Sequence, residues 1–116
     1  MERPAPGHIG ACVEHPRAAR TLLIAVDLGL FDELGTGPRS APQLHRRLGL
    51  DVAALSEVLR ALEAWGLIGC DGQGEHALYL ATREGTRYLD SRSPAYLRDW
   101  LHDLRQRLRP TDSDLR

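Results

Sequence analysis

The sequence contains no lysine and no asparagine, so all fifteen of its basic side chains are arginines. Without asparagine, one of the two side chains that pair bidentately with adenine is missing. The formal net charge is −1, so no overall positive field draws the chain toward nucleic acid or anionic membranes. The composition therefore disfavours a nucleic-acid partner.

Long apolar runs are also absent, and none approaches the ~20 residues that a membrane-spanning helix needs. The segment from Met1 to His8 lacks the basic-then-apolar layout of a signal peptide. Cysteine is scarce, because only Cys12 and Cys70 occur, far apart and at no metal-ligand spacing. We therefore expect reduced thiols in a cytoplasmic protein without a membrane partner.

Recognisable catalytic motifs are missing as well. No serine or cysteine lies in a nucleophile elbow, and no carboxylate pair is placed for acid–base work. The five histidines fall on different predicted elements, with no pair four residues apart, which indicates surface positions rather than a metal or haem site. We predict no catalytic, cofactor-binding or metal-binding residue, so enzymatic activity of the chain alone lacks support.

What is present is a series of short helices. Apolar side chains at helical spacing predict a helix from Pro16 to Leu28, and Asp32 to Leu34 predicts one more turn. Ser40 and Gln43 form a capping box that opens the next helix, which Gly49 ends. Asp51 caps a third helix running to Trp65.

Two short strands follow, at residues 67–70 and 77–81, around a glycine-rich turn. A helix-turn-helix followed by a β-hairpin is a winged helix. The predicted fold class is therefore mainly α, a winged helix-turn-helix with a short β-hairpin wing and extra N- and C-terminal helices. Thr82 then begins a short helix through Leu89.

The last predicted helix begins at Ser93-Pro94, a cap and first-turn pair, and stops at Pro110. Its apolar stripe would contribute roughly 1.5–3 kcal/mol per side chain if fully buried. Two arrangements remain open, since the helix either folds back on its own domain or packs on a second chain. The predicted interface combines residues of the first and last helices: Leu22, Leu23, Val26, Leu97, Trp100, Leu101, Leu104 and Leu108.

In this order the motifs resemble the N-terminal dimerisation domain of small-molecule O-methyltransferases that use S-adenosylmethionine. The first-helix signature is residues 25–34 (AVDLGLFDEL), and the third helix with the first wing strand is residues 59–68 (LRALEAWGLI). The resemblance runs from Arg17 to Leu97. Its other pieces are GPRSA at 37–41, Leu44, LGLD at 48–51, YLAT at 79–82, Gly85, YL at 88–89 and SPAYL at 93–97.

The resemblance implies a domain that forms an interlocked homodimer and lids an acceptor pocket, next to a separate Rossmann-like catalytic domain. A methyl-donor site needs a strand, a glycine-rich turn at a helix N-terminus and a later acidic residue. None is present, because glycine-rich residues 69–74 lie between two short strands and predict a hairpin turn. We expect a homodimer, with a separate methyltransferase catalytic chain as an additional partner.

Two other functions remain as alternatives. A winged helix is also the fold of many DNA-binding transcriptional regulators, but residues 51–65 carry one arginine against three acids. DNA readers need cationic and amide side chains there. A stand-alone dimer that binds a hydrophobic or aromatic small molecule would use Tyr96 and Trp100 as pocket residues, because the family implies a lid function.

The predicted organisation is an N-terminal arm at 1–15, a winged-helix dimerisation domain at 16–92, a C-terminal amphipathic helix at 93–109 and a tail at 110–116. The polar residues 111–116 are typical of a solvated tail rather than a cut helix. This ending favours a stand-alone protein over the front part of a longer methyltransferase.

Overall fold

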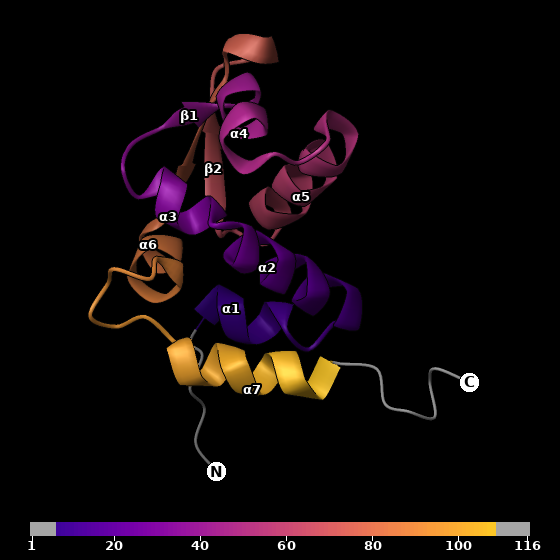
Figure 1. Cartoon of the computed structure of the whole chain (residues 1–116), viewed down its shortest axis with the longest axis vertical. Coiled ribbons are helices and arrows are strands. Elements are labelled where there is room, and N and C mark those ends of the chain that lie inside the picture. The colour runs from indigo at the N-terminus through magenta and orange to yellow at the C-terminus, as the bar shows by residue number, and fades with distance from the viewer. Residues whose placement is uncertain (1–6, 109–116) are drawn as a thin grey trace.

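A computed structural model describes residues 7–108 of the chain, so the predictions for Pro110 and for the tail lie outside the described residues. Figure 1 shows α1, α2 and α7 at one end of the molecule and the sheet with α4 at the other. The helices are α1 (Gly7–Cys12), α2 (Pro16–Leu28), α3 (Leu30–Leu34), α4 (Ala41–Leu48), α5 (Val52–Ala64), α6 (Arg83–Leu89) and α7 (Arg98–Leu108). The remaining elements are the strands β1 (Arg39–Ser40), β2 (Ile68–Asp71) and β3 (Leu78–Ala81), and the 3₁₀ helix η1 (Gly74–His76).

The boundaries of α4 and α5 follow the capping residues that the sequence predicts. The Ser40 amide donates to the Gln43 side chain at 2.8 Å, and the Gln43 amide donates to the Ser40 hydroxyl at 3.3 Å. The Asp51 carboxylate accepts from two amides in the first turn of α5. Gly49 ends α4 with a φ of 72°, a left-handed conformation that favours glycine. The predicted caps of α4 and α5 are confirmed.

The wing belongs to a three-stranded antiparallel sheet in the order β1-β3-β2. Residues Ile68 and Cys70 of β2 lie opposite Ala81 and Tyr79 of β3, so the predicted hairpin is confirmed. The two-residue strand β1 was not predicted, because its pairing with β3 is a long-range contact that leaves no periodic pattern. Helix-turn-helix and hairpin together confirm the mainly helical winged-helix fold class.

The core lies where α2, α3, α5 and α6 meet, around the fully buried ring of Phe31. Helix α1, within the segment predicted as an arm, buries Ile9 and Cys12 in this core. The Glu84 carboxylate of α6 holds α1 by accepting from the Ile9 amide at 2.7 Å and bonding the His8 ring at 2.8 Å. Among the described residues, no helix combines the length and apolar character needed to cross a membrane.

Helix α7 begins at Arg98, so the predicted start at Ser93 is wrong. The segment before it is a loop held by the end of α6, since the Leu97 amide donates to the Tyr88 carbonyl at 3.0 Å. The Ser93 hydroxyl donates to the Arg87 carbonyl at 2.6 Å and accepts from the Ala95 amide at 3.2 Å. Ser93 therefore fixes a turn over α6 rather than the first turn of a helix.

Candidate dimer interface

The outer face of α2 carries one apolar side chain between two charges. Arg20, Ile24 and Asp27 recur at i, i+4 and i+7, which places them in one row along the helix. All three are exposed, and Ile24 keeps 49% of its surface in solvent, whereas the opposite face of α2 is in the core. A single exposed isoleucine is common on protein surfaces. Whether Ile24 belongs to an interaction surface depends on the residues around it.

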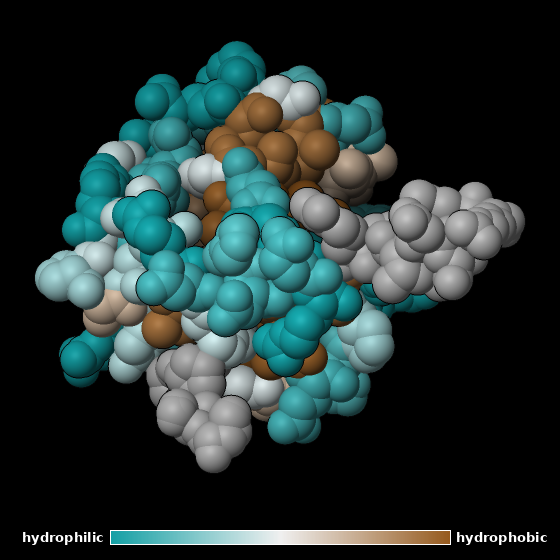
Figure 2. Space-filling model, turned by 60° about the horizontal axis from the view of Figure 1, so that its bottom comes forward, coloured by the Kyte–Doolittle hydropathy of each residue, from teal (hydrophilic) through white to brown (hydrophobic). Residues whose placement is uncertain are grey.

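Beside Ile24, a groove of about 330 Å³ runs between α2 and α7. Its apolar surface comes from the side chains of Leu23, Ile24 and Leu108 and from the methylene stems of two arginines. The lining residues are Arg20, Leu23, Ile24, Asp27, Arg105 and Leu108. Figure 2 looks onto the side of the molecule that carries α7 and shows brown, hydrophobic surface beside teal, hydrophilic residues.

Helix α7 forms the second wall of this groove because it is anchored to α2. Leu101 and Leu104 are buried in the core, with exposures of 0% and 4%. At the groove edge the Arg105 guanidinium pairs with the Asp27 carboxylate, with Nη2 2.6 Å from Oδ1 and Nε 3.3 Å from Oδ2. The helix thus folds back on its own chain, which is one of the two arrangements that the sequence left open.

The predicted interface residues divide into two groups in the structure. Leu22, Leu23, Leu101 and Leu104 are buried in the core of the single chain. The other four are half-buried and pack against that core: Val26, Leu97, Trp100 and Leu108. Their part in a dimer interface stays a prediction. Sequence reasoning missed Ile24, although an isoleucine outside the buried stripe and between charged positions was the available signal.

The two predicted pocket residues lie apart from the groove. Tyr96 is half-buried in the loop before α7, with the Arg98 guanidinium 5.3 Å from the centre of its ring. Trp100 lies half-buried on α7 and packs against the core. Neither residue lines the α2–α7 groove or the two hollows described next. A small-molecule pocket at these residues stays a prediction.

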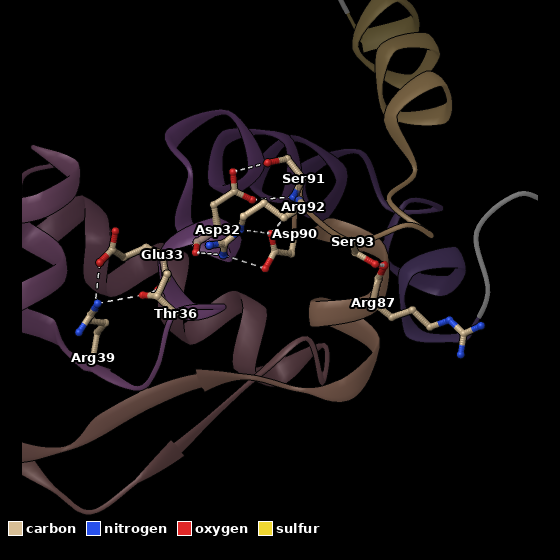
Figure 3. A network of polar contacts seen from close by, with 9 residues as sticks. All are labelled: Asp32, Glu33, Thr36, Arg39, Arg87, Asp90, Ser91, Arg92 and Ser93. Atoms are coloured by element: carbon tan, nitrogen blue, oxygen red, sulfur yellow. Dashed lines mark hydrogen bonds and ion pairs between the residues drawn. The ribbon is translucent and has the colours of Figure 1, made fainter.

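An open hollow of about 740 Å³ lies between α6 and the loop that follows it. Asp90 and Arg92 are among the residues that line it. Figure 3 shows their polar network, in which the Asp90 carboxylate accepts two hydrogen bonds at 3.0 Å from the Arg92 guanidinium. Arg92 also donates to the Asp32 carbonyl at 2.6 Å, and the Asp32 carboxylate accepts from the amide and hydroxyl of Ser91 at 2.6 Å. The network ties α3 to the chain after α6.

Burial alone would raise the pKa of Asp90, but hydrogen bonds from Arg92 and its positive charge outweigh burial and hold that pKa below its ordinary value. In the same pair, the Asp90 carboxylate raises the pKa of Arg92. A Cβ at Gly35 would stand 2.1 Å from Asp90 Oδ2, so a larger residue there would have to displace this pair. We infer that the network stabilises the fold rather than binding a ligand, because the Asp90 carboxylate and the Arg92 guanidinium are already paired with each other.

A third hollow, of about 300 Å³, lies between α4, α5 and η1, near the helix that would enter a DNA groove in a regulator. The exposed face of α5 carries Glu57 and Glu63 with Arg60 as its basic side chain. This acidic balance is unsuited to phosphate contacts. Among the described residues, no three His, Cys, Asp or Glu side chains gather closely enough to hold a metal ion.

Comparison with known proteins identifies the family to which the chain belongs. The family model for the O-methyltransferase dimerisation domain matches residues 13–91, more than half of the chain. No curated protein sequence matches the chain.

Three similar solved structures are methyltransferases or are bound to S-adenosylhomocysteine. Human N-acetylserotonin methyltransferase in complex with SAM has a TM-score of 0.69 and 23% identity, covering 74% of this chain and 26% of its own. An O-methyltransferase family protein from Burkholderia thailandensis has a TM-score of 0.64 and 26% identity, covering 78% and 26%. PigF with SAH has a TM-score of 0.61 and 28% identity, covering 76% and 28%.

The chain thus spans about a quarter of the length of these structures. The family model covers every element from α2 to α6, including the helix-turn-helix, the wing and the exposed row of α2. On the basis of that match, this chain belongs to the O-methyltransferase dimerisation domain family.

Proposed function

We propose that this chain is a non-catalytic dimerisation module that forms a homodimer through the face shared by α2 and α7. The observation that carries the proposal is the exposed Ile24 directly beside the groove of about 330 Å³. The face therefore offers a half-exposed apolar side chain that continues into the apolar wall of the groove. In two identical copies, the Ile24 side chains can pack against each other and cover this wall.

Twofold symmetry favours this use of the face. A dimer with a twofold axis uses the same patch on both copies, so the patch must be complementary to itself. An apolar side chain near the middle of the patch meets that condition, because it can pack on the same side chain of the second copy. Ile24 is 49% exposed, so burying the rest of it would contribute about 1 kcal/mol per copy, roughly half of the value for a fully exposed side chain. Leu23 and Leu108, which also line the groove, would add apolar contacts.

The test is the mass of the full chain in solution. Native mass spectrometry and light scattering across a concentration series are expected to show a dimer. Ile24→Glu places a carboxylate at the centre of the face and is expected to give a folded monomer, because an unpaired buried charge is costly. A wild-type chain that remains monomeric up to roughly 100 μM contradicts the proposal.

Val52→Glu is the matched control. Val52 is 55% exposed, slightly more than Ile24, and lies in the first turn of α5 rather than on the α2–α7 face. The same chemical change at Val52 is expected to leave the dimer intact. If both glutamate variants abolish the dimer equally, the α2–α7 face is not the interface.

We also propose that this chain leaves methyl transfer to a separate catalytic chain or domain. Its described strands form an antiparallel sheet of three short strands, whereas the donor site of a Rossmann-like domain needs a parallel strand-turn-helix unit. Titration calorimetry of the chain with S-adenosylhomocysteine is expected to give no binding heat. Micromolar or tighter binding to the chain alone would contradict this part of the proposal.

A further inference from the structure

The charged side chains on the exposed row of α2 indicate how the two copies of the proposed dimer are oriented. We infer that the two copies pair through α2 helices that run antiparallel, with Arg20 of each copy against Asp27 of the other. This inference rests on the proposed homodimer and adds the orientation of the copies and the residues that select the partner. The partner is a second copy of this chain.

The spacing along α2 sets the geometry. Arg20 and Asp27 are equally far from the midpoint between Leu23 and Ile24. At 1.5 Å per residue, each lies about 5 Å from that midpoint along the helix. A twofold axis through the midpoint and perpendicular to α2 therefore places Arg20 opposite the second copy's Asp27 on both sides. The same axis brings the two Ile24 side chains to the centre of the contact.

The charges distinguish antiparallel from parallel pairing. In a parallel twofold contact each residue faces the same residue of the second copy. Arg20 would then face Arg20, and Asp27 would face Asp27. Like charges placed against each other across an interface are unfavourable. In the antiparallel contact both flanking pairs are opposite in sign. The row on α2 is thus complementary to itself in one orientation only.

Both groups are available for such a contact. Arg20 is exposed and forms no ion pair within the part of the chain that the structure describes. The Asp27 side chain is 52% exposed although it holds Arg105. A carboxylate offers about four acceptor positions, and Arg105 uses two of them. Asp27 can therefore accept a second guanidinium from the other copy.

The test uses two charge-changed chains that should reject themselves and accept each other. The acidic chain carries Arg20→Glu. The basic chain carries Asp27→Arg together with Arg105→Glu, which keeps the ion pair within the chain with its signs exchanged. Circular dichroism verifies that both chains are folded, and native mass spectrometry measures homodimer and heterodimer in single and mixed samples.

Each variant alone is expected to dimerise at least about tenfold more weakly than wild type, because two contacts become repulsive. The mixture is expected to form a heterodimer at near wild-type affinity, since both contacts are again opposite in sign. In about 1 M salt, where the screening length is about 3 Å, the self-rejection of the Arg20→Glu chain is expected to disappear.

Two results would overturn the inference. One is an Arg20→Glu chain that dimerises as tightly as wild type. The other is a mixture of two folded, monomeric variants that forms no heterodimer. In either case a dimeric wild type that loses its dimer in Ile24→Glu leaves the proposed function standing. A monomeric wild type removes the proposed function and the inference with it.

Discussion

Arg105 of α7 donates two hydrogen bonds to the Asp27 carboxylate of α2, from Nη2 to Oδ1 at 2.6 Å and from Nε to Oδ2 at 3.3 Å. The residues are 78 positions apart in the sequence, so this contact closes the last described helix onto the first long one. It also forms the polar edge of the α2–α7 groove. The pair therefore links the stability of α7 to the shape of the candidate interface.

Arg105→Ala is expected to lower the free energy of unfolding by up to about 1 kcal/mol, since exposed ion pairs contribute little. Hydrogen exchange of the α7 amides is expected to accelerate more than exchange in α5, because the helix loses its polar attachment. Urea denaturation and hydrogen exchange measure the two effects. Arg107→Ala, at an exposed position of the same helix, is the control and should change neither.

Leu101→Ala is expected to lower the free energy of unfolding by about 2–5 kcal/mol, because it leaves a cavity where a fully buried side chain packed. Denaturant unfolding measures the loss. Gln106→Ala, exposed on the same helix, should stay within about 0.5 kcal/mol of wild type. A Leu101 variant as stable as wild type would mean that α7 does not pack on its own chain in solution.

Gly35→Ala is expected to destabilise the chain by about 1–3 kcal/mol, because the new Cβ would stand 2.1 Å from Asp90 Oδ2. The backbone is not the cause, since Gly35 has a φ of −67°, which alanine adopts readily. Thermal and urea unfolding measure the change. Gly69→Ala is the matched control, because a Cβ at Gly69 would meet no atom within 4 Å.

Stability is expected to fall in acid partly through Asp90. Its pKa is below the ordinary value of 3.8 in the folded chain, so the folded state favours the carboxylate. This contribution is present above the unfolded pKa and is lost as the pH falls through the lowered folded pKa. Urea unfolding from about pH 5 downwards should show a shallower loss for Asp90→Asn, which starts less stable at neutral pH. Equal slopes for both chains would contradict the assignment.

Cys12 is expected to be nearly inert toward alkylation, because burial raises the pKa of its thiol to about 11 and the thiolate is the reactive species. Its Sγ also lies 3.6 Å from the Ala18 carbonyl, to which it donates. Iodoacetamide followed by mass spectrometry should modify exposed Cys70 in the native chain and Cys12 only in urea. Cys70→Ser isolates the Cys12 reaction as a control.

Local signals predicted much of the fold. The Ser40–Gln43 capping box, the Asp51 cap and Gly49 act within a few residues, so the sequence reveals them directly. Long-range contacts were not visible in this way. Ser93 has the composition of a helix cap, yet its hydroxyl bonds the Arg87 carbonyl of the preceding helix. Helix α1 was missed because its packing depends on Glu84, 75 residues from Ile9.

The candidate interface was predicted only in part. The sequence pointed to the first and last helices, and the groove lies between them. It did not separate side chains that face the chain's own core, such as Leu101, from side chains that face solvent, such as Ile24. Apolar periodicity identifies a face but not what covers that face. Only the position of α7 supplied that information.

The sequence by itself determined the helix caps, the helix-turn-helix, the hairpin and the family resemblance, because these depend on residues close together or in a fixed order. Tertiary structure decided that α7 covers α2 of its own chain, with Leu101 buried and Arg105 bound to Asp27. It also left Ile24 exposed beside a groove. The physical reason is that an apolar stripe gains the same free energy against any apolar surface, so only three-dimensional packing selects which surface it meets.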